Sequence, residues 1–316
     1  MMKYYLGVNG GATSSRFVLA DQLGNVLTEG EAGPMSFVAQ SRQTVLDNLR
    51  QGLEQVTSKF FLDESTEGQS SDFEIIYAVL GIASVDTDQE EQEVAEVIRP
   101  VLEEFSVNQF TVINDAITAL VNGTQREDAV ILISGTGSNC YGQNEKGREA
   151  KAGGYDYLLS DQGSGYALGL AALKAGLKSY DQRGQKTVLE QKLVKHFGVD
   201  DFSQLKSVVY QPDLSKTEVA ELALLVFEGL EQDDLVCREL IDLAAKELWL
   251  MVATVVERLN LSEQPFDLVL EGSVAQSAAM IKRLSSLLKT DYSQAELVLP
   301  HQSAVYGALE LAMTGS

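Results

Sequence analysis

The sequence predicts an α/β protein built from two lobes of similar topology around an interdomain cleft, and three observations support this fold class. The chain has 316 residues, which at about 100–200 residues per domain suggests two domains. Short apolar runs that end in glycine-rich turns alternate with longer segments of helical period. This succession occurs twice, so we expect two copies of one unit.

The chain opens with three short apolar runs at residues 4–8, 15–20 and 26–29. The first two are separated by a turn rich in Gly and Ser, and the second and third by an Asp, Gly and Asn turn. Such residues favour tight reversals of the chain. We therefore predict an antiparallel meander of three strands.

Helices and buried strands follow in alternation. The apolar spacing predicts helices over residues 43–60 and 90–105, strands over 74–83 and 109–114, and a helix that opens at 115. Three strands followed by this α and β alternation make up half of a ribonuclease-H-like protein. We place the first lobe at residues 1–117 and expect the last helix, 303–316, to complete it.

The second lobe is expected at residues 118–302, with a helical insertion. Its predicted elements are a strand over 129–134, long helices over 219–227 and 235–259, a strand over 267–270, a helix from Val274 and a strand over 296–299. The order resembles that of the first lobe, although two unrelated α/β domains would also give alternating elements.

The charge and the cysteines exclude several classes of function. The formal net charge is −22, from 46 acidic and 24 basic residues, and no cluster of Lys or Arg offsets it, so we expect no nucleic-acid partner. The two cysteines are far apart and predict neither a disulfide framework nor a zinc site. No apolar run reaches about 18 residues, and the N-terminus is too short and polar for a signal peptide. We expect a cytoplasmic protein that binds no membrane.

Two glycine turns that follow predicted strands are candidate phosphate sites, because glycine lets a polyphosphate approach the backbone N–H groups. The first contains Gly10, Gly11, Thr13 and Ser14, and the second contains Gly135, Thr136 and Gly137. Each alone is a weak signal, since such turns are common in hairpins. Together they predict a nucleotide between two facing hairpins.

Asp115 lies where a predicted strand ends and a helix begins. Asp is a good N-cap residue, so this position has a purely structural interpretation. It is also suited to a general base that takes a proton from a hydroxyl attacking a γ-phosphoryl group. Spacing alone leaves both interpretations open.

Two later turns are further candidates. Gly154, Tyr155 and Asp161 precede a predicted helix, where Tyr155 would stack on a sugar and Asp161 would bind a hydroxyl or a metal-bound water. A turn followed by an N-cap is the structural alternative. Gly272 and Ser273 follow a strand, and we expect them near the adenosine of a nucleotide.

These motifs together resemble the N-acetylglucosamine kinase and BadF/BadG/BcrA/BcrD ATPase family, in the family's order and over almost the whole chain. The segments that carry the resemblance are GVNGGATSSRFVLADQLGNVL, INDAITAL, VILISGTGSNCYGQNEKG, AGGYDYLLSDQGSGYALG, LVLEGSVAQS and HQSAVYGALELA. The stretch ISGTGSNC is the most specific match.

The resemblance implies an actin-like ATPase and sugar-kinase fold, Mg²⁺ and ATP as phosphoryl donor, and an amino sugar, N-acetylglucosamine first, as acceptor at its 6-hydroxyl. It implies that Asp115 is the base. We also expect a homodimer. The nucleotide contacts would be Asn9, Gly10, Gly11, Thr13, Ser14, Gly135, Thr136, Gly137, Gly272 and Ser273. The sugar contacts would be Ser36, Asn114, Gly154, Tyr155 and Asp161.

The chain departs from the family's pattern at several of these positions. Asn9 stands where the family usually has Asp or Glu, so its expected contact with Mg²⁺, through water, lacks a charge. Tyr155 replaces the usual Trp, and Gln162 replaces a carboxylate. Two alternatives therefore remain. One is an ATPase that activates a partner enzyme and shares an iron–sulfur cluster through two cysteines, and the other is a non-catalytic sugar or nucleotide sensor.

Overall fold

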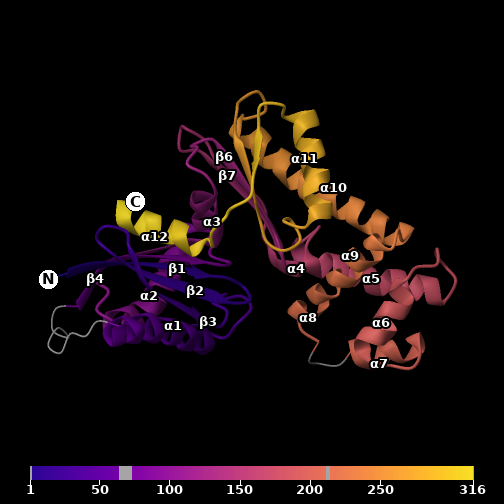
Figure 1. Cartoon of the computed structure of the whole chain (residues 1–316), viewed down its shortest axis with the longest axis horizontal. Helices are drawn as coiled ribbons and strands as arrows, with labels where there is room; N and C mark the ends of the chain where they lie inside the picture. Colours follow the sequence, from indigo (N-terminus) through magenta and orange to yellow (C-terminus); the bar gives the residue numbers. More distant parts are fainter. Residues whose placement is uncertain (1, 64–72, 211–213, 316) are drawn as a thin grey trace. The chain divides into compact units, whose positions relative to one another are not determined.

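The structure is a computed structural model that describes residues 2–63, 73–210 and 214–315. It divides into two compact units. Unit 1 comprises Met1–Gln125 with Pro300–Ser316, and unit 2 comprises Arg126–Leu299. Within the described residues each unit contains one five-stranded mixed sheet with helices packed on it (Figure 1).

Unit 1 begins with the meander that the turns predict. Its elements are β1 (Met2–Gly10), β2 (Ser15–Asp21), β3 (Val26–Ala32), α1 (Arg42–Asp63), β4 (Phe73–Ile82), α2 (Asp88–Glu104), β5 (Phe110–Asn114), α3 (Asp115–Gly123) and, from the end of the chain, α12 (Val305–Thr314). The strand order is β3-β2-β1-β4-β5. The first three strands are antiparallel, and β4 and β5 run parallel to β1.

The sheet of unit 1 is covered on both faces (Figure 1). Apolar residues of α1 and α2 form the larger core with one face, including Leu49, Leu53 and Ile98, which are fully buried. On the other face α12 packs on β1, β2 and β4 through Val305 and Ala308. Because both faces are buried, the central strands β1 and β4 are almost continuously apolar.

Unit 2 repeats this arrangement and adds helices. Its elements are β6 (Ala129–Ser134), β7 (Ser138–Gln143), β8 (Glu149–Gly153), α4 (Asp156–Leu159), α5 (Gly165–Tyr180), α6 (Leu189–Phe197), a 3₁₀ turn (Phe202–Gln204), α7 (Leu205–Val209), α8 (Lys216–Glu221), α9 (Ala223–Glu231), α10 (Leu235–Leu259), β9 (Asp267–Glu271), α11 (Ala278–Asp291) and β10 (Glu296–Val298). The strand order is β10-β9-β6-β7-β8.

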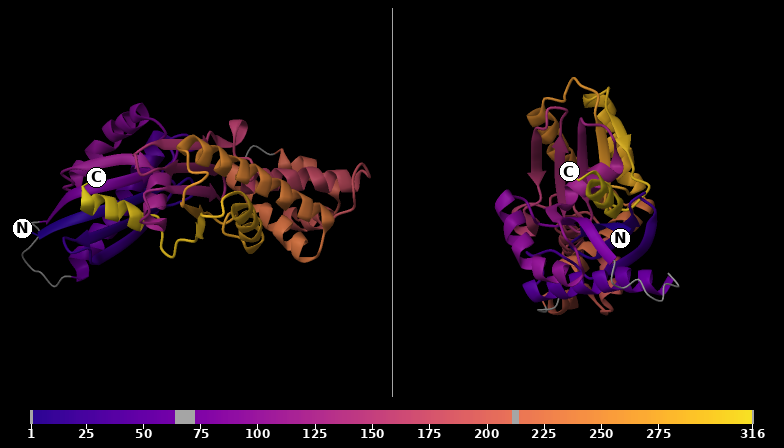
Figure 2. Two further views of the ribbon diagram at one scale, coloured as in Figure 1. Left: turned by 90° about the horizontal axis from the view of Figure 1, so that it is seen from above. Right: turned by 90° about the vertical axis from the view of Figure 1, so that its left-hand side faces the viewer.

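The two sheets share one topology. In each, three antiparallel strands joined by tight turns are followed by two strands parallel to the first. The predicted fold class, two lobes of one ribonuclease-H-like plan, is therefore confirmed. In unit 2 the core is formed by the long helix α10, which packs against α5, α9 and α11 as well as the sheet (Figure 2). None of the helices in the described ranges combines the length and apolar character of a membrane span.

Two details differ from the sequence-based expectation. The helix expected from Val274 begins at Ala278, because Ser277 caps it by accepting a hydrogen bond from the N–H of Met280. The expected lobe boundary at 117/118 lies inside α3, whereas the structure divides after Gln125. The reason is that α12 lies directly on α3. A Cβ on Gly307 would be 2.0 Å from the carbonyl oxygen of Thr118, so only glycine permits this approach.

Candidate functional site

The first glycine turn closes the β1–β2 hairpin of unit 1. The N–H of Gly11 donates to the carbonyl of Ser14 at 3.0 Å, and the carbonyl of Gly11 accepts from the N–H of Met35 at 3.1 Å. A Cβ on Gly10 would lie 2.8 Å from the Cβ of Met35, which explains the glycine. Thr13 and Ser14 are exposed at the tip. The contact with Met35 thus fixes the backbone of the turn, while the hydroxyl side chains of Thr13 and Ser14 face solvent.

Asp115 is the first residue of α3, at the carboxyl end of β5, but it is not the N-cap. The cap is Asn114, whose side-chain oxygen accepts from the N–H of Ala116 at 2.8 Å. The structural interpretation of Asp115 as a capping residue is therefore wrong, because the preceding residue already fills that role. The helix N-terminus still favours a negative charge at Asp115.

The side chain of Asn114 holds the neighbouring loop as well. Its amide nitrogen donates to the carbonyl of Val85 at 2.8 Å and to Oδ1 of Asp86 at 2.7 Å. Both amide hydrogens are thus engaged, and only the oxygen keeps a lone pair for a ligand. The arrangement fixes the backbone from which Asp115 projects.

Asn9 lies close to the start of α3. The hydroxyl of Thr118 donates to the carbonyl of Asp115 at 2.8 Å and lies 3.2 Å from Oδ1 of Asn9. A Cβ on Gly81 would clash with Thr118 at 2.6 Å. The ends of β1, β4 and β5 therefore gather Asn9 and Asp115 at one edge of the sheet, where parallel strands commonly form ligand sites.

Ser36 is buried in the loop after β3. Its hydroxyl is 3.1 Å from that of Ser84, and either group can be the donor. Ser84 has a φ of +67°, an uncommon conformation for serine. The sequence analysis missed Ser84 and Asp86, because nothing in the local pattern distinguishes them from ordinary loop residues.

The second glycine turn joins β6 to β7 in unit 2 and is held from two sides. The carbonyls of Gly135 and Thr136 accept from the N–H groups of Gly165 and Tyr166, at 2.7 and 3.2 Å. On the other side Gly272 has a φ of +92°, and a Cβ there would lie 2.5 Å from the carbonyl of Ser134. These close approaches explain why this segment is rich in glycine and serine.

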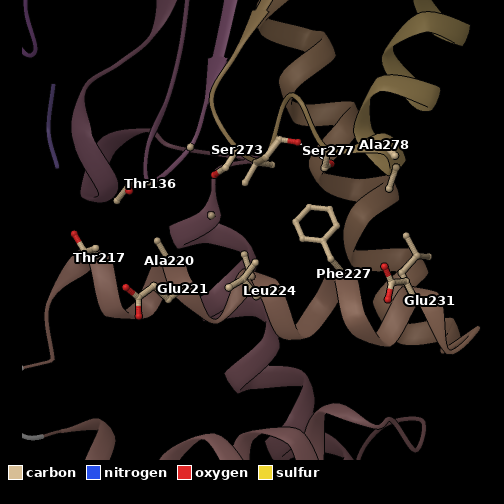
Figure 3. Close-up of a pocket in the computed structure, with 16 residues that line it drawn as sticks. Thr136, Thr217, Ala220, Glu221, Leu224, Phe227, Glu231, Ser273, Ser277 and Ala278 are labelled. Carbon is tan, nitrogen blue, oxygen red and sulfur yellow. Dashed lines mark hydrogen bonds between the residues drawn. The ribbon is translucent and has the colours of Figure 1, made fainter. Parts of the chain in front are cut away.

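A pocket of about 640 Å³ opens beside this turn and is formed entirely by unit 2. Figure 3 shows Thr136 and Thr217 near one end, the ring of Phe227 in the middle, and Glu231 and Ala278 at the other end. The volume lies within the range of about 300–1,000 Å³ that is typical of cofactor and small-molecule sites. A glycine turn next to a largely apolar wall fits a nucleotide.

Three of the predicted nucleotide contacts line this pocket, namely Gly135, Thr136 and Ser273. Gly137 and Gly272 belong to the flanking turns. The opposite wall comes from α8 and α9, whose residues the sequence analysis did not single out. Those helices have an ordinary amphipathic pattern, so their sequence contains no local sign of a ligand.

Gly154 and Tyr155 lie after β8, in the segment that leads into α4. Gly154 has a φ of +78°, and a Cβ on it would meet Oδ1 of Asn139 at 2.9 Å. That oxygen is buried and accepts no hydrogen bond from the described residues. The Tyr155 ring is 63% exposed and has Nζ of Lys151 5.3 Å from its centre. An unpaired buried acceptor beside an exposed ring suits a polar ligand with an apolar face, so Asn139 joins the candidate residues.

Asp161 is almost fully buried. Its Oδ1 accepts from the N–H of Ser138 at 2.9 Å, and its Oδ2 lies 2.7 Å from Nζ of Lys216. The N-cap of the following helix is Ser164, which accepts from the N–H of Ala167. Asp161 thus forms the turn before α5 but does not cap the helix, and in this structure it holds the second glycine turn.

The described residues of the two units form no complete metal-binding site. Among the described residues no group of three or more His, Cys, Asp and Glu side chains could hold an ion. Mg²⁺ needs fewer protein ligands, because it keeps several waters and is usually held by one or two carboxylates plus substrate phosphates. Asn9 supplies an amide oxygen, which fits a magnesium ion that arrives with a nucleotide and is contacted through water.

Both cysteines are buried in the core of unit 2. Burial raises the pKa of the Cys140 thiol far above its ordinary value, and burial together with the charge of Asp234 raises the pKa of Cys237 to about 12. Thiolates bind metals, and thiols with such pKa values stay protonated. This chemistry disfavours an iron–sulfur cluster at these two positions.

Comparison with known proteins places these features in context. The profile of the BadF/BadG/BcrA/BcrD ATPase family matches residues 6–312. The N-acetylmuramic acid/N-acetylglucosamine kinase of Clostridium acetobutylicum is 30% identical over 312 residues, covering 98% of both chains. The N-acetyl-D-glucosamine kinase of Dictyostelium discoideum is 29% identical over 313 residues, covering 98% of this chain and 97% of that protein.

Solved structures share the fold. A candidate N-acetylglucosamine kinase from Chromobacterium violaceum superposes with a TM-score of 0.76 at 22% identity, covering 98% of each chain. A ROK family glucokinase from Streptomyces griseus, solved with glucose and AMPPNP, gives a TM-score of 0.60 at 14% identity, covering 99% of this chain and all of that chain. These likenesses confirm the predicted fold class.

Proposed function

The chain belongs to the BadF/BadG/BcrA/BcrD ATPase family, and on this premise we propose that it is an ATP-dependent kinase that phosphorylates the 6-hydroxyl of an amino sugar, N-acetylglucosamine first. Two curated relatives of nearly the same length are amino-sugar kinases by name, which supports a sugar kinase. The observation that carries the proposal is the position of Asp115. It projects from the edge of the sheet, and Asn114 has already taken the capping role.

In the proposed reaction Asp115 is the general base. Its carboxylate takes the proton of the sugar hydroxyl, and the hydroxyl oxygen forms a bond to the γ-phosphorus of ATP. The bond between that phosphorus and the β,γ-bridging oxygen breaks, so ADP leaves with the electron pair. A base of this kind contributes about 10²–10⁴-fold to the rate.

We assign the pocket of unit 2 to the adenosine, with its phosphates toward the Gly135–Gly137 turn. Phe227 and Leu224 offer apolar surface for the adenine ring, and Glu221 is placed for the ribose hydroxyls (Figure 3). The N–H groups of the glycine turn would hold the phosphate oxygens, as such turns do in other nucleotide sites. Gly10, Gly11, Thr13 and Ser14 are proposed as further phosphate contacts.

Mg²⁺, when bound, would neutralise charge on the phosphate oxygens. We propose that Asn9 contacts it through a water molecule. Asn9 is neutral, so it orients a metal-bound water by a hydrogen bond without adding attraction. The approach of Thr118 to Asn9 fixes that amide near the start of α3.

The sugar contacts that we propose are Ser36, Asn114, Gly154, Tyr155 and Asp161. The exposed ring of Tyr155 would stack on the apolar face of the pyranose. Ser36 would bind hydroxyls together with the free lone pair of Asn114. Oδ1 of Asp161 accepts from the N–H of Ser138, whereas Oδ2 lies 2.7 Å from Nζ of Lys216 and accepts no hydrogen bond from the described residues. Oδ2 is therefore the oxygen that we propose for the contact with the sugar.

Product analysis tests the proposal directly. The purified chain is incubated with ATP, Mg²⁺ and, separately, N-acetylglucosamine, N-acetylmannosamine, glucosamine and N-acetylmuramic acid. We expect ADP and a sugar monophosphate whose phosphate is at carbon 6 by ³¹P and ¹³C NMR. If no amino sugar gives a phosphorylated product, the proposed function is wrong.

We also propose that the protein acts in the cytoplasm as a homodimer. Light scattering coupled to size-exclusion chromatography tests the dimer, since the chain mass is 34.4 kDa. A mass near that of one chain at micromolar concentration would contradict this part of the proposal. Fractionation of the native cell tests the location.

A further inference from the structure

Lys216, the first residue of α8, forms ion pairs with two carboxylates of unit 2. Its Nζ lies 2.7 Å from Oδ2 of Asp161 and also donates to Oδ1 of Asp156. Partial burial alone would lower the pKa of Lys216, but the hydrogen bonds and charges of the two carboxylates raise it above its ordinary 10.5. The side chain therefore stays charged at every physiological pH and can bridge both partners.

The first partner, Asp161, controls the second glycine turn. It accepts from the N–H of Ser138, immediately after the turn, and a Cβ on Gly137 would lie 2.9 Å from its Oδ1. A buried carboxylate without a cation would be costly, so the ion pair with Lys216 offsets that cost and holds Asp161 in place. The position of the turn thus depends on Lys216.

The second partner, Asp156, controls the segment that carries Tyr155. Asp156 has a φ of +64°, and its carbonyl accepts from the N–H of Ser160 at 2.8 Å. The hydroxyl of Ser160 in turn accepts from the N–H of Tyr155 at 2.7 Å. Lys216 therefore holds a closed loop of residues 155–160, here called the acceptor loop, through one carboxylate.

Helix α8 is also a wall of the nucleotide pocket. Thr217, Ala220 and Glu221 of this short helix line the cavity (Figure 3). Thr217 directly follows Lys216, so a ligand that orders α8 also orders the lysine. The cation is consequently attached to three parts of unit 2, namely the pocket wall, the glycine turn and the acceptor loop.

We propose that Lys216 is a positioning residue that couples the nucleotide pocket to the acceptor loop, so that nucleotide and sugar each strengthen the binding of the other. The inference rests on the proposed function, because it takes the acceptor loop as the sugar site. Its physical basis is entropic. The first ligand orders α8 or the loop, and the second ligand then loses less conformational freedom on binding.

The test is a thermodynamic cycle on the full chain. Calorimetry measures the Kd of N-acetylglucosamine with and without a saturating non-hydrolysable ATP analogue and Mg²⁺, and the Kd of the analogue with and without sugar. The two ratios must agree, because coupling between binding sites is reciprocal. We expect the wild-type protein to show a ratio of about fivefold or more.

Asp156→Asn is the main variant. Asn tolerates the left-handed conformation, so the backbone is retained, while the charge that attaches the acceptor loop to Lys216 is lost. The matched control is Glu228→Gln, which neutralises the carboxylate paired with Lys192 at 2.6 Å elsewhere in the helices of unit 2. We expect the ratio to fall toward one in Asp156→Asn, with the analogue's own Kd unchanged, and to stay at the wild-type value in Glu228→Gln.

A second pair of variants distinguishes the positioning role of Lys216 from a general effect on folding. Lys216→Met removes both ion pairs, and we expect it to weaken the analogue as well as abolish the coupling. Lys216→Arg keeps the charge, and its fork can reach two carboxylates, so it should restore at least half of the coupling. Thermal unfolding checks that each variant is folded.

The outcomes separate this inference from the proposed function. If the wild-type protein phosphorylates no amino sugar, both are wrong. If it phosphorylates N-acetylglucosamine but Asp156→Asn retains the full coupling, only the role of Lys216 is wrong. An equal loss of coupling in Glu228→Gln would also overturn it, since the effect would then follow from any lost ion pair in these helices.

Discussion

Replacement of Asp115 by Asn is the sharpest test of the proposed chemistry. The change keeps the size of the side chain and removes its ability to take a proton. General bases contribute about 10²–10⁴-fold to a rate, and at about 1.4 kcal/mol per tenfold change this corresponds to about 3–5 kcal/mol of transition-state stabilisation. We therefore expect kcat to fall by at least a hundredfold.

The structure predicts a far smaller effect on stability. The capping hydrogen bond from the N–H of Ala116 goes to Asn114 and is untouched. Asp115→Asn weakens the interaction of a charge with the first turn of α3, worth about 0.3–1 kcal/mol. The variant should thus stay folded while it loses activity.

Asp88 offers a matched control. It is the first residue of α2, as Asp115 is of α3, and the preceding residue, Thr87, caps that helix through its own side chain. Asp88→Asn therefore removes the same charge at the same helical position, with the same expected cost in stability. Any loss of activity that arises only from the helix terminus would appear in both variants.

The assay measures ADP release by a coupled spectrophotometric reaction, confirms the sugar phosphate by mass spectrometry, and follows urea unfolding of each variant. The reasoning is refuted if Asp115→Asn keeps kcat within about tenfold of the wild-type protein, below the contribution of a general base. It is equally refuted if Asp88→Asn loses as much activity as Asp115→Asn.

Three further predictions concern unit 2. Gly272→Ala should lower the free energy of unfolding by about 1–3 kcal/mol, because its φ of +92° and the 2.5 Å approach to the carbonyl of Ser134 exclude a Cβ; an unchanged urea midpoint would contradict this. Phe227→Ala should raise the KM for ATP about tenfold or more, because contact with the adenine ring is lost and such stacking is worth about 1–3 kcal/mol. The KM for the sugar should stay unchanged, and a shift in the sugar KM alone would assign the pocket to another ligand. Partial burial opposes the charge on Asp156, but hydrogen bonds from Lys216 and a backbone N–H lower its pKa below the ordinary 3.8. The pair therefore contributes fully above about pH 3.8 and loses its contribution as the pH falls below 3.8 through the lower folded value. The difference in urea midpoint between wild type and Asp156→Asn should be constant from neutral pH down to about 3.8 and shrink below it; a difference that persists unchanged well below 3.8 would contradict this.

Much of the fold follows from local signals. The bounds of β6 and α10 agree with the expected ranges, because a short apolar run between turns and a long stretch of helical period are recognisable without tertiary information. Helix α11 begins four residues later than expected, because Ser277 and not Ser273 caps it. The glycine turns were also recognisable from local sequence, because tight turns and close backbone approaches favour glycine.

The candidate site was only partly predictable. Asp115 could be singled out at a strand end, but its role as cap or base depended on whether Asn114 turned its own side chain onto the helix. The walls of the pocket on α8 and α9 have an ordinary helical pattern, so no local feature distinguishes Phe227 from a core residue.

The sequence by itself determined the α/β class, the repeat of one topology, the order of the glycine turns and the family, because these depend on local backbone chemistry and on motifs read along the chain. Only the tertiary structure decided which residue caps α3 and that Lys216 joins Asp156, 60 residues away in sequence, to the buried Asp161. The physical reason is the separation in sequence of the residues that interact. Turns and helices form from neighbouring residues, whereas an ion pair between distant segments exists only after the core has brought them together.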